Sequence, residues 1–365
     1  MKNFLKLDWM VIASVFLLVA IGLTALYSVS TFPSTRELNL GDFKKQIVAL
    51  VLGLGLGAFF SSFDYRVLSS YSTKLYFGAL ILLGSLFLIG TRVRGTTAWI
   101  GFGPFHIEPV EIVKLVIIIF LASFLSKKKT ELSMLWRIIG SIVLVFIPVF
   151  LIMKQPDFGS ASVIIGIWGG MLVASGINKK SIFILLVIGI IGATSGWFFL
   201  KTYQKERIVN FVKPANDPLG TGYNVIQSTV AVGSGGFLGK GLGHGSQSQL
   251  NFLPEKHTDF IFAVIAEELG LFGAFMVLGL YMFLLYRIRE TARLARDNFG
   301  YLISVGVIIM LFVQIFINVG MNIGVVPVAG VPLPFLSYGG SSLVVMLASM
   351  GLVQSVYMRR IKTLD

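Results

Sequence analysis

The chain has 365 residues, of which 55% are hydrophobic and only 13% are charged, and its mean hydropathy is +0.85. So little polar surface cannot cover a water-soluble globule, which predicts one integral membrane domain over residues 1–365. The absence of cysteine excludes disulfides, thiolate nucleophiles and cysteine-bound metals. The net charge of +13 does not indicate a nucleic-acid partner, because the basic residues cluster between apolar segments, where membrane topology and anionic lipid explain them better.

Apolar runs of spanning or near-spanning length occur along the whole chain. They lie near residues 9–30, 46–62, 75–91, 110–126, 137–153, 161–177, 181–200, 260–286, 300–322 and 340–357. They predict an all-α polytopic protein with about ten transmembrane helices and both termini on one side. Basic clusters at 127–129, 179–180, 287–296 and 359–362 make that side the cytoplasmic one. The protein is therefore expected in the cytoplasmic (inner) membrane, with a large extracytoplasmic loop, about 201–258, between helices seven and eight.

A polar loop turns into an apolar helix within the stretch 252–270, FLPEKHTDFIFAVIAEELG. Thr258 or Asp259 is suited to cap this helix, because a side-chain oxygen there accepts a free backbone N–H and a carboxylate suits the positive end of the helix dipole. The alternative is that Asp259 is a catalytic carboxylate. Glu267 and Glu268, deeper in the same helix, favour a functional site, because ionisable groups at membrane depth are usually functional.

The fourth helix opens with HIEPVEIVKL, in which Glu111 and Lys114 are three residues apart and share one face. A buried pair of this kind either fixes helix packing or lines a polar cavity that is open to the outside. The two roles are compatible, and we treat both residues as candidate substrate-binding groups.

The remaining candidates lie in outer loops. Asp157 lies in KQPDFGS, beside a proline and a glycine as in a turn. Arg207 belongs to a basic cluster, and its guanidinium suits bidentate phosphate binding. A cluster that faces lipid headgroups is equally consistent with the sequence. His257 is a candidate substrate-binding residue beside Asp259. The histidines are too dispersed for a convincing metal site.

The run Gly233 to Gly245, GSGGFLGKGLGHG, lacks the spacing of a nucleotide phosphate loop, since glycine rather than serine or threonine follows Lys240. Its backbone N–H groups are nevertheless suited to hold a lipid-borne pyrophosphate. We expect part of this loop to be mobile without substrate and to bring Lys240 towards the leaving group as a lid closes. The alternatives are a plain loop or an ordered plug on the helices.

The outer segment 326–342, VPVAGVPLPFLSYGGSS, contains three prolines, which exclude an ordinary helix. Irregular backbone at membrane depth is tolerated only where protein or a water-filled cavity covers it. The segment is therefore predicted to form a cavity wall near Asn318 and Asn322.

Together these stretches resemble the SEDS family (shape, elongation, division and sporulation) of peptidoglycan glycosyltransferases, which includes the RodA and FtsW types. The matching motifs are EPVEIVK, QPDFGSA, Arg207, DPLGTGYNVIQS, GSGGFLGKG, LPEKHTDFIFAVIAEELG and PVAGVPLPFLSYGGSS. The stretch GSQSQLNFLPEKHTDF is more similar to the RodA type. The chain departs from the family where Ala98 precedes Trp99 in place of an arginine, and where the run 108–110 reads Glu-Pro-Val in place of Gln-Pro-Ser.

The resemblance implies polymerisation of lipid II, the undecaprenyl-pyrophosphate-linked disaccharide pentapeptide, into glycan strands on the outer face of the cytoplasmic membrane during cell elongation and shape maintenance. It aligns Asp259 with the family's essential loop aspartate, and Glu111 and Lys114 with paired residues of a central cavity. It also implies a class B penicillin-binding protein as transpeptidase partner, together with other membrane proteins of the elongation complex. A divalent cation, Mg²⁺ or Mn²⁺, is a candidate cofactor, and no nucleotide is expected.

Two other interpretations stay open. A lipid II flippase or transporter suits ten helices and intramembrane charges equally well, but it needs a polar path that reaches the cytoplasmic side, whereas the unusual residues of this sequence gather outside. A scaffold that only positions a partner enzyme is the other, and it would tolerate the loss of the Asp259 carboxylate.

Overall fold

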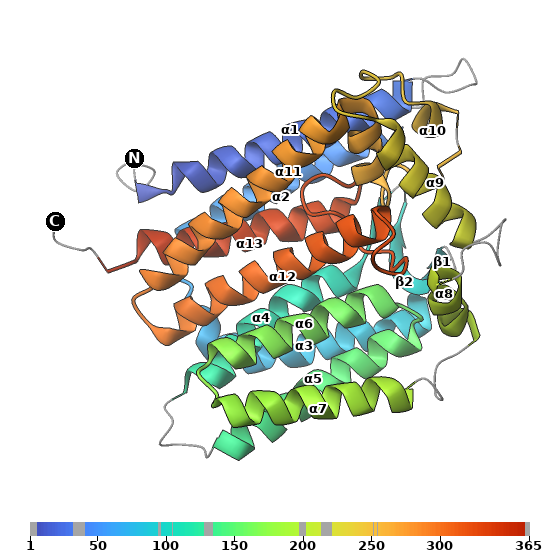
Figure 1. The fold of residues 1–365 in the computed structure, drawn as a ribbon. Coiled ribbons are helices and arrows are strands. Elements are labelled where there is room, and N and C mark those ends of the chain that lie inside the picture. Colours follow the sequence, from blue (N-terminus) through green and yellow to red (C-terminus); the bar gives the residue numbers. More distant parts are fainter. Residues whose placement is uncertain are drawn as a thin grey trace.

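The computed structural model describes residues 6–31, 41–93, 96–103, 105–127, 134–196, 202–212, 221–250, 252–253 and 255–361. Its long helices run side by side in one bundle, and the start of α1 and the end of α13 lie at the same end of that bundle (Figure 1). We call this end the inner end. The opposite end, which carries a small sheet and the short helices α8 to α10, is called the outer end.

A helix lies along most of each of the ten predicted apolar runs, and residues 197–200 of the seventh run lie outside the described part of the chain. The helices are α1 (Trp9–Thr31), α2 (Gly41–Ser62), α3 (Val67–Ile89), α4 (Pro109–Ser126), α5 (Met134–Lys154), α6 (Phe158–Ala174), α7 (Lys179–Gly196), α8 (Thr202–Val212), α9 (Thr221–Ser234), α10 (Ser246–Gln249), α11 (Ile261–Arg293), α12 (Asn298–Asn322) and α13 (Gly340–Met358). Among the described residues, eight helices are long and apolar enough to cross a membrane, and α6 is a slightly shorter apolar helix. The chain is thus a multi-pass membrane protein, while the total of ten crossings and the cytoplasmic position of the inner end stay predictions.

The starts of three helices follow from local sequence. Pro109 stands at the first position of α4, where its missing N–H would have had no helical partner anyway. Asp157 is the N-cap of α6 and accepts a hydrogen bond from the Ser160 N–H at 2.9 Å. Asp297 caps α12 in the same way through the Gly300 N–H at 2.7 Å.

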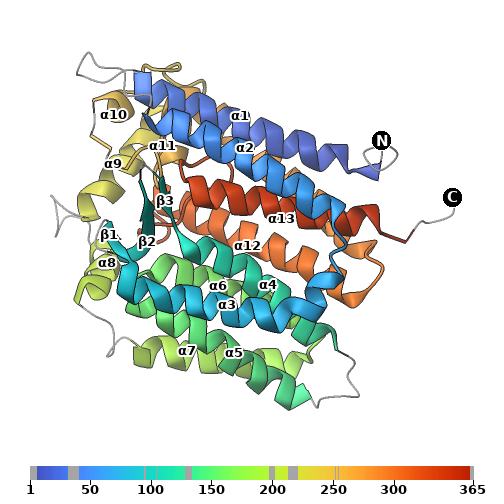
Figure 2. The same cartoon turned by 180° about the vertical axis from the view of Figure 1, so that it is seen from behind.

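The loop between α3 and α4 forms a three-stranded antiparallel sheet that the sequence analysis did not predict (Figure 2). Its strands are β1 (Thr91–Val93), β2 (Thr96–Phe102) and β3 (Phe105–Ile107), in the order β1-β2-β3. Thr91 pairs with Trp99, and Gly101 pairs with His106. Strands this short carry almost no periodic pattern, so the sequence gives little sign of them.

The centre of the bundle consists of α4, α12 and α13, whose apolar side chains are mostly buried, whereas α2, α3 and α5 turn many apolar side chains outward, as expected for contact with lipid. Small residues allow the closest helix contact. A Cβ atom added to Gly351 of α13 would lie 2.3 Å from the carbonyl oxygen of Gly57 in α2, so these two backbones touch directly.

The inner end is held by paired charges. Arg287, near the end of α11, donates to the buried carboxylate of Asp8 with an N–O distance of 2.7 Å. The side chain of Gln354 in α13 exchanges two hydrogen bonds of 2.9 Å with the Asp8 backbone. These contacts tie α1, α11 and α13 together.

Candidate functional site

The backbone before α11 is fixed by two asparagines of α12. The amides of Asn318 and Asn322 each donate to the Asp259 carbonyl oxygen at 3.0 Å. Asn318 also donates to the Val331 carbonyl at 2.8 Å, which joins the proline-rich segment 326–342 to the same point. Because both asparagine side chains are fully buried, the Asp259 backbone is attached to the packed interior of the bundle.

The two preceding carbonyl groups are held by the proline-rich segment. The Ser337 hydroxyl donates to the Thr258 carbonyl at 2.6 Å, and the Tyr338 N–H donates to the His257 carbonyl at 2.9 Å. Gln46 of α2 donates in turn to the Ser337 carbonyl at 3.2 Å. The predicted position of the segment beside Asn318 is confirmed, and His257 lies beside Asp259 as expected.

The Asp259 side chain is half-buried and lies close to Gly330, since a Cβ atom on that glycine would be 3.8 Å from the carboxylate Oδ2. Helix α11 begins at Ile261, and its N-cap residue is Phe260, whose side chain makes no capping hydrogen bond. Neither Thr258 nor Asp259 therefore occupies the N-cap position. The predicted N-cap role of Thr258 or Asp259 is wrong, because Phe260 stands at that position.

The predicted pair on α4 is present and buried. The Lys114 ammonium lies 2.7 Å from Glu111 Oε1, and each side chain is only 1% exposed. The other carboxylate oxygen, Glu111 Oε2, is buried without a hydrogen-bond partner among the described residues. Such an acceptor is costly in a low-dielectric interior unless a ligand or water completes it.

Glu108, the residue before α4, joins these groups electrostatically. Burial raises the pKa of its carboxyl well above the ordinary value for glutamate, and the negative charge of Glu111 adds to this effect. Asp157 and, more weakly, Asp259 also raise this pKa, whereas the Lys114 ammonium opposes the rise. Carboxylates from α4, from the start of α6 and from the loop before α11 thus share one electrostatic environment at the outer end.

Asp157 reaches this environment through a close backbone contact. Its turn leads into α6, where a Cβ atom on Gly159 would lie 2.2 Å from the Ala329 carbonyl oxygen. Only glycine allows the start of α6 to approach the proline-rich segment so closely. The predicted turn at Asp157 is confirmed, with Asp157 itself capping α6.

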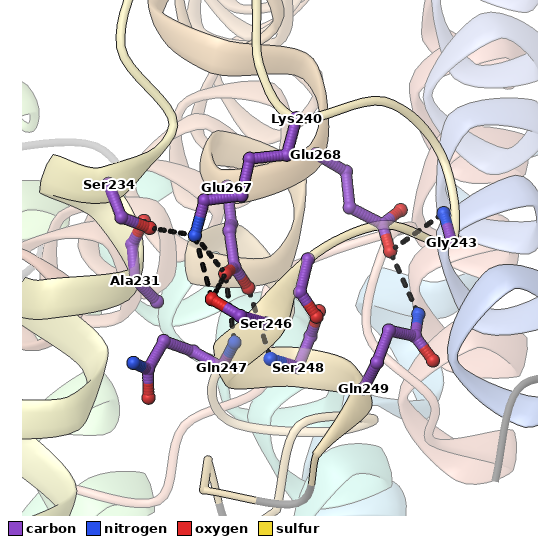
Figure 3. Close-up of polar contacts among 11 residues, drawn as sticks. Ala231, Ser234, Lys240, Gly243, Ser246, Gln247, Ser248, Gln249, Glu267 and Glu268 are labelled. Carbon is purple, nitrogen blue, oxygen red and sulfur yellow. Dashed lines mark hydrogen bonds and ion pairs between the residues drawn. The ribbon is translucent and has the colours of Figure 1, made fainter.

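Lys240 is held in a separate cluster (Figure 3). Its ammonium donates to Glu267 Oε1 at 2.9 Å and to the hydroxyl groups of Ser234 and Ser246 at 2.8 and 2.9 Å. Glu267 also accepts the backbone N–H groups at the start of α10. These contacts favour an ordered plug over a lid, and closure of the loop around substrate stays a prediction.

Arg207 lies in α8, but its side chain falls outside the described part of the chain. Among the residues that the structure does describe, no group of three or more histidines, aspartates or glutamates has the geometry of a metal site. The divalent cation therefore stays a prediction.

Sequence reasoning missed two polar residues of this region. Glu108 was treated only as a departure from a family motif. It stands three residues before Glu111 and directly before Pro109, the first residue of α4, so it lies at the outer end of that helix. Gln314 of α12 was not considered. It lies one turn before Asn318, and a stripe of amides at four-residue spacing, Gln314, Asn318 and Asn322, was a readable sign.

Comparison with known proteins agrees with this geometry. Residues 8–362 match the cell cycle protein family of FtsW, RodA and SpoVE. The peptidoglycan glycosyltransferase MrdB of Escherichia coli K12 is 38% identical over 92% of this chain and 90% of its own length. The stage V sporulation protein E of Bacillus subtilis is 37% identical over 96% of both chains.

Solved structures show the same fold. A chain from a structure described as showing the coordination of polymerization and crosslinking by a peptidoglycan synthase complex superposes with a TM-score of 0.82, at 34% identity, over 98% of this chain and 99% of that one. The rod shape determining protein RodA of Thermus thermophilus superposes with a TM-score of 0.74, at 28% identity, over 99% of this chain and 100% of its own. This chain belongs to the FtsW, RodA and SpoVE family.

Proposed function

We propose that this chain is a peptidoglycan glycosyltransferase that polymerises lipid II on the outer face of the cytoplasmic membrane. The observation that carries the proposal is the position of Asp259, with its backbone carbonyl fixed by Asn318 and Asn322 and its carboxylate among the charged groups at the outer end. Relatives named as peptidoglycan glycosyltransferases and matched over nearly their whole length support it.

In this reaction, a sugar hydroxyl of the acceptor attacks the anomeric carbon of the donor with inversion. The new glycosidic C–O bond forms as the bond to the lipid pyrophosphate breaks, and the Asp259 carboxylate accepts the proton of the hydroxyl. Negative charge nearby favours the protonated form of such a base. Asp157, which shares an electrostatic environment with Asp259 around Glu108, is placed to supply it.

The departing pyrophosphate needs positive charge. Lys114 is the first candidate to supply this charge, because Glu111 contacts its ammonium through only one carboxylate oxygen. Arg207 on α8 is the second candidate. A divalent cation is proposed only as an ion that arrives with the pyrophosphate, because Mg²⁺ is commonly held by one or two carboxylates together with substrate phosphates.

The decisive experiment compares Asp259→Asn with Asp64→Asn, a matched change at the inner end where Asp64 lies 3.6 Å from Arg359. Each purified variant is placed in vesicles that carry lipid II in the outer leaflet, and the glycan products are separated by length. We expect Asp259→Asn to keep the thermal midpoint of wild type and to make no polymer, while Asp64→Asn makes polymer. Normal polymer from Asp259→Asn would exclude Asp259 as the base and favour a scaffold.

The flippase alternative has its own readout in the same vesicles. If wild-type protein moves lipid II between leaflets without forming any polymer, the enzyme proposal is lost.

We also propose a class B penicillin-binding protein as partner, with a role in cell elongation. A related chain is found in a peptidoglycan synthase complex, and the RodA fold is shared. Co-purification with such a transpeptidase, retained in Asp259→Asn, is the expected result. Loss of the complex in this variant would place Asp259 in partner binding instead.

A further inference from the structure

Helix α11 is broken two turns from its start. Gly270 has φ 68° and ψ −165°, which no continuous helix contains, so the preceding carbonyl groups lose their helical partners. The loop after α9 supplies replacements: the Lys240 N–H donates to the Glu267 carbonyl at 3.0 Å, and the Gly241 N–H donates to the Glu268 carbonyl at 2.9 Å.

The same loop satisfies the other side of the break. The Leu271 N–H donates to the Gly236 carbonyl at 2.8 Å, and the Phe272 N–H donates to the Phe237 carbonyl at 3.2 Å. Residues 235–243, which we call the re-entrant loop, therefore complete the backbone hydrogen bonding of α11. Backbone at membrane depth needs such internal pairing.

The fit between the two backbones depends on glycine. Gly239 has φ 80°, and a Cβ atom on it would lie 2.1 Å from the Glu268 carbonyl oxygen. A Cβ atom on Gly270 would lie 2.3 Å from the Gly239 nitrogen. The backbone of the re-entrant loop thus packs directly against the backbone at the break in α11.

The charge of the re-entrant loop is neutralised. Lys240 is its one lysine or arginine, the loop has no acidic residue, and the ammonium is paired with the fully buried Glu267 carboxylate (Figure 3). With this pair closed, the loop presents to its surroundings mainly the apolar side chains that remain.

Those side chains are strongly exposed. Phe237 is 79% exposed and Leu238 is 86% exposed. They lie near exposed apolar residues on α11, where Phe272 and Phe275 are 70% and 64% exposed, because the backbone hydrogen bond from the Phe272 N–H to the Phe237 carbonyl brings the two segments together. Because α11 is long and apolar enough to span a membrane, we expect its exposed apolar residues to face lipid.

We propose that Phe237 and Leu238 insert among the acyl chains of the outer leaflet, so that the re-entrant loop anchors the outer part of α11 to the membrane. Continuity with the lipid-facing side of α11, paired backbone groups and a neutralised lysine all suit hydrocarbon. This inference is independent of the enzymatic proposal. A partner helix or a second copy of the chain on the same side chains is the competing occupant.

The absence of native cysteine allows a direct test. Leu238→Cys carries a bimane label in vesicles of phosphatidylcholine and phosphatidylglycerol, with or without doxyl-labelled lipid. Phe275→Cys on α11 is the lipid reference, and His244→Cys is the water reference, because His244 is a nearby exposed polar residue. A thermal midpoint near that of the unsubstituted protein confirms that each labelled variant is folded.

We expect the Leu238→Cys label to match the Phe275→Cys label, with blue-shifted emission that doxyl lipid quenches and with protection from a water-soluble thiol reagent. Emission like that of His244→Cys would overturn the proposal. Protection from both the lipid quencher and the water-soluble reagent would overturn it as well, and would assign the loop to a protein contact. The double variant Phe237→Ser/Leu238→Ser should increase hydrogen exchange at the Gly239–Gly241 amides in vesicles, because the loop loses its anchor. Unchanged exchange would contradict an anchoring role.

Discussion

Two buried glutamates at the outer end are each paired with a lysine, yet the two pairs differ. Glu111 and Lys114 are both 1% exposed, and one oxygen of Glu111 has no partner in the described part of the chain. Glu267 is also fully buried, but it accepts hydrogen bonds at both oxygens, from Lys240 and from backbone N–H groups of α10. Its Lys240 is 28% exposed.

The difference separates structure from function. A carboxylate with both oxygens satisfied by protein donors stabilises its surroundings and needs no ligand to complete it. A carboxylate with a free buried oxygen is costly unless something else completes it. We therefore assign Glu267 to the architecture of the re-entrant loop and Glu111 to the site.

The largest expected effect comes from breaking the site pair. Glu111→Gln or Lys114→Met alone leaves the other charge buried and uncompensated, which should lower the free energy of unfolding by roughly 3–5 kcal/mol. The double variant should recover most of this loss, because no charge remains stranded. Polymerisation per folded molecule should stay low in all three variants if the pair contacts substrate.

Thermal unfolding and polymer assays on the same samples check this expectation. Additive stability losses would show that Glu111 and Lys114 do not interact. A double variant with normal activity would show that the pair is structural, like Glu267, and does not contact substrate.

The structural pair should respond differently. Glu267→Gln removes a charged acceptor from several donors, which should lower the free energy of unfolding by about 2–3 kcal/mol. Hydrogen exchange should rise over residues 240–249, and activity should fall only as the folded fraction falls. Lys240→Met is the matched control, and its effect should be smaller because the lysine already contacts water. A loss of turnover without any change in stability would instead give Lys240 the substrate role predicted from sequence.

The helices and the Glu111–Lys114 pair were predictable, because apolar runs and three-residue spacing are local features of the sequence, whereas the catalytic role of Asp259 stays a prediction. The partners of Asp259 were not fully predictable. Asn318 and Asn322 were placed near the proline-rich segment, but their bonds to the Asp259 carbonyl join residues about sixty positions apart. The contact between the re-entrant loop and the break at Gly270 was not predicted. A glycine-rich run is typical of a flexible loop, and the sequence of α11 does not reveal the break.

Glu108 offers a pH test of the shared environment. Its pKa is raised in the folded protein, so the folded state holds a proton that the unfolded state has lost above about pH 4.3. The stability that this carboxyl contributes is therefore fully present below that value, and it is lost as pH rises through the higher pKa of the folded state. Glu108→Gln should remove this part of the pH slope in thermal unfolding measured at a series of pH values. An identical slope in the variant would mean that the Glu108 carboxyl is not crowded by the site charges.

The smallest expected effect on stability concerns Gln314, whose amide oxygen and nitrogen are both buried without partners in the described residues. Gly306 of α12 lies against Ile118 of α4, and the helices are antiparallel, so two turns outward Gln314 stands at about the level of Glu111. We expect this unpaired amide to line the site near Glu111.

Gln314→Met should therefore leave stability unchanged or raise it by about 1 kcal/mol, because no hydrogen bond is lost and an unsatisfied group is removed, while polymerisation falls. Gln354→Met is the matched control. Both polar atoms of Gln354 are bonded to Asp8, so its loss should cost about 2 kcal/mol at the inner end. Destabilisation by Gln314→Met with unchanged turnover would mean that Gln314 has a structural partner, and that an unpaired buried amide does not mark the site in this fold.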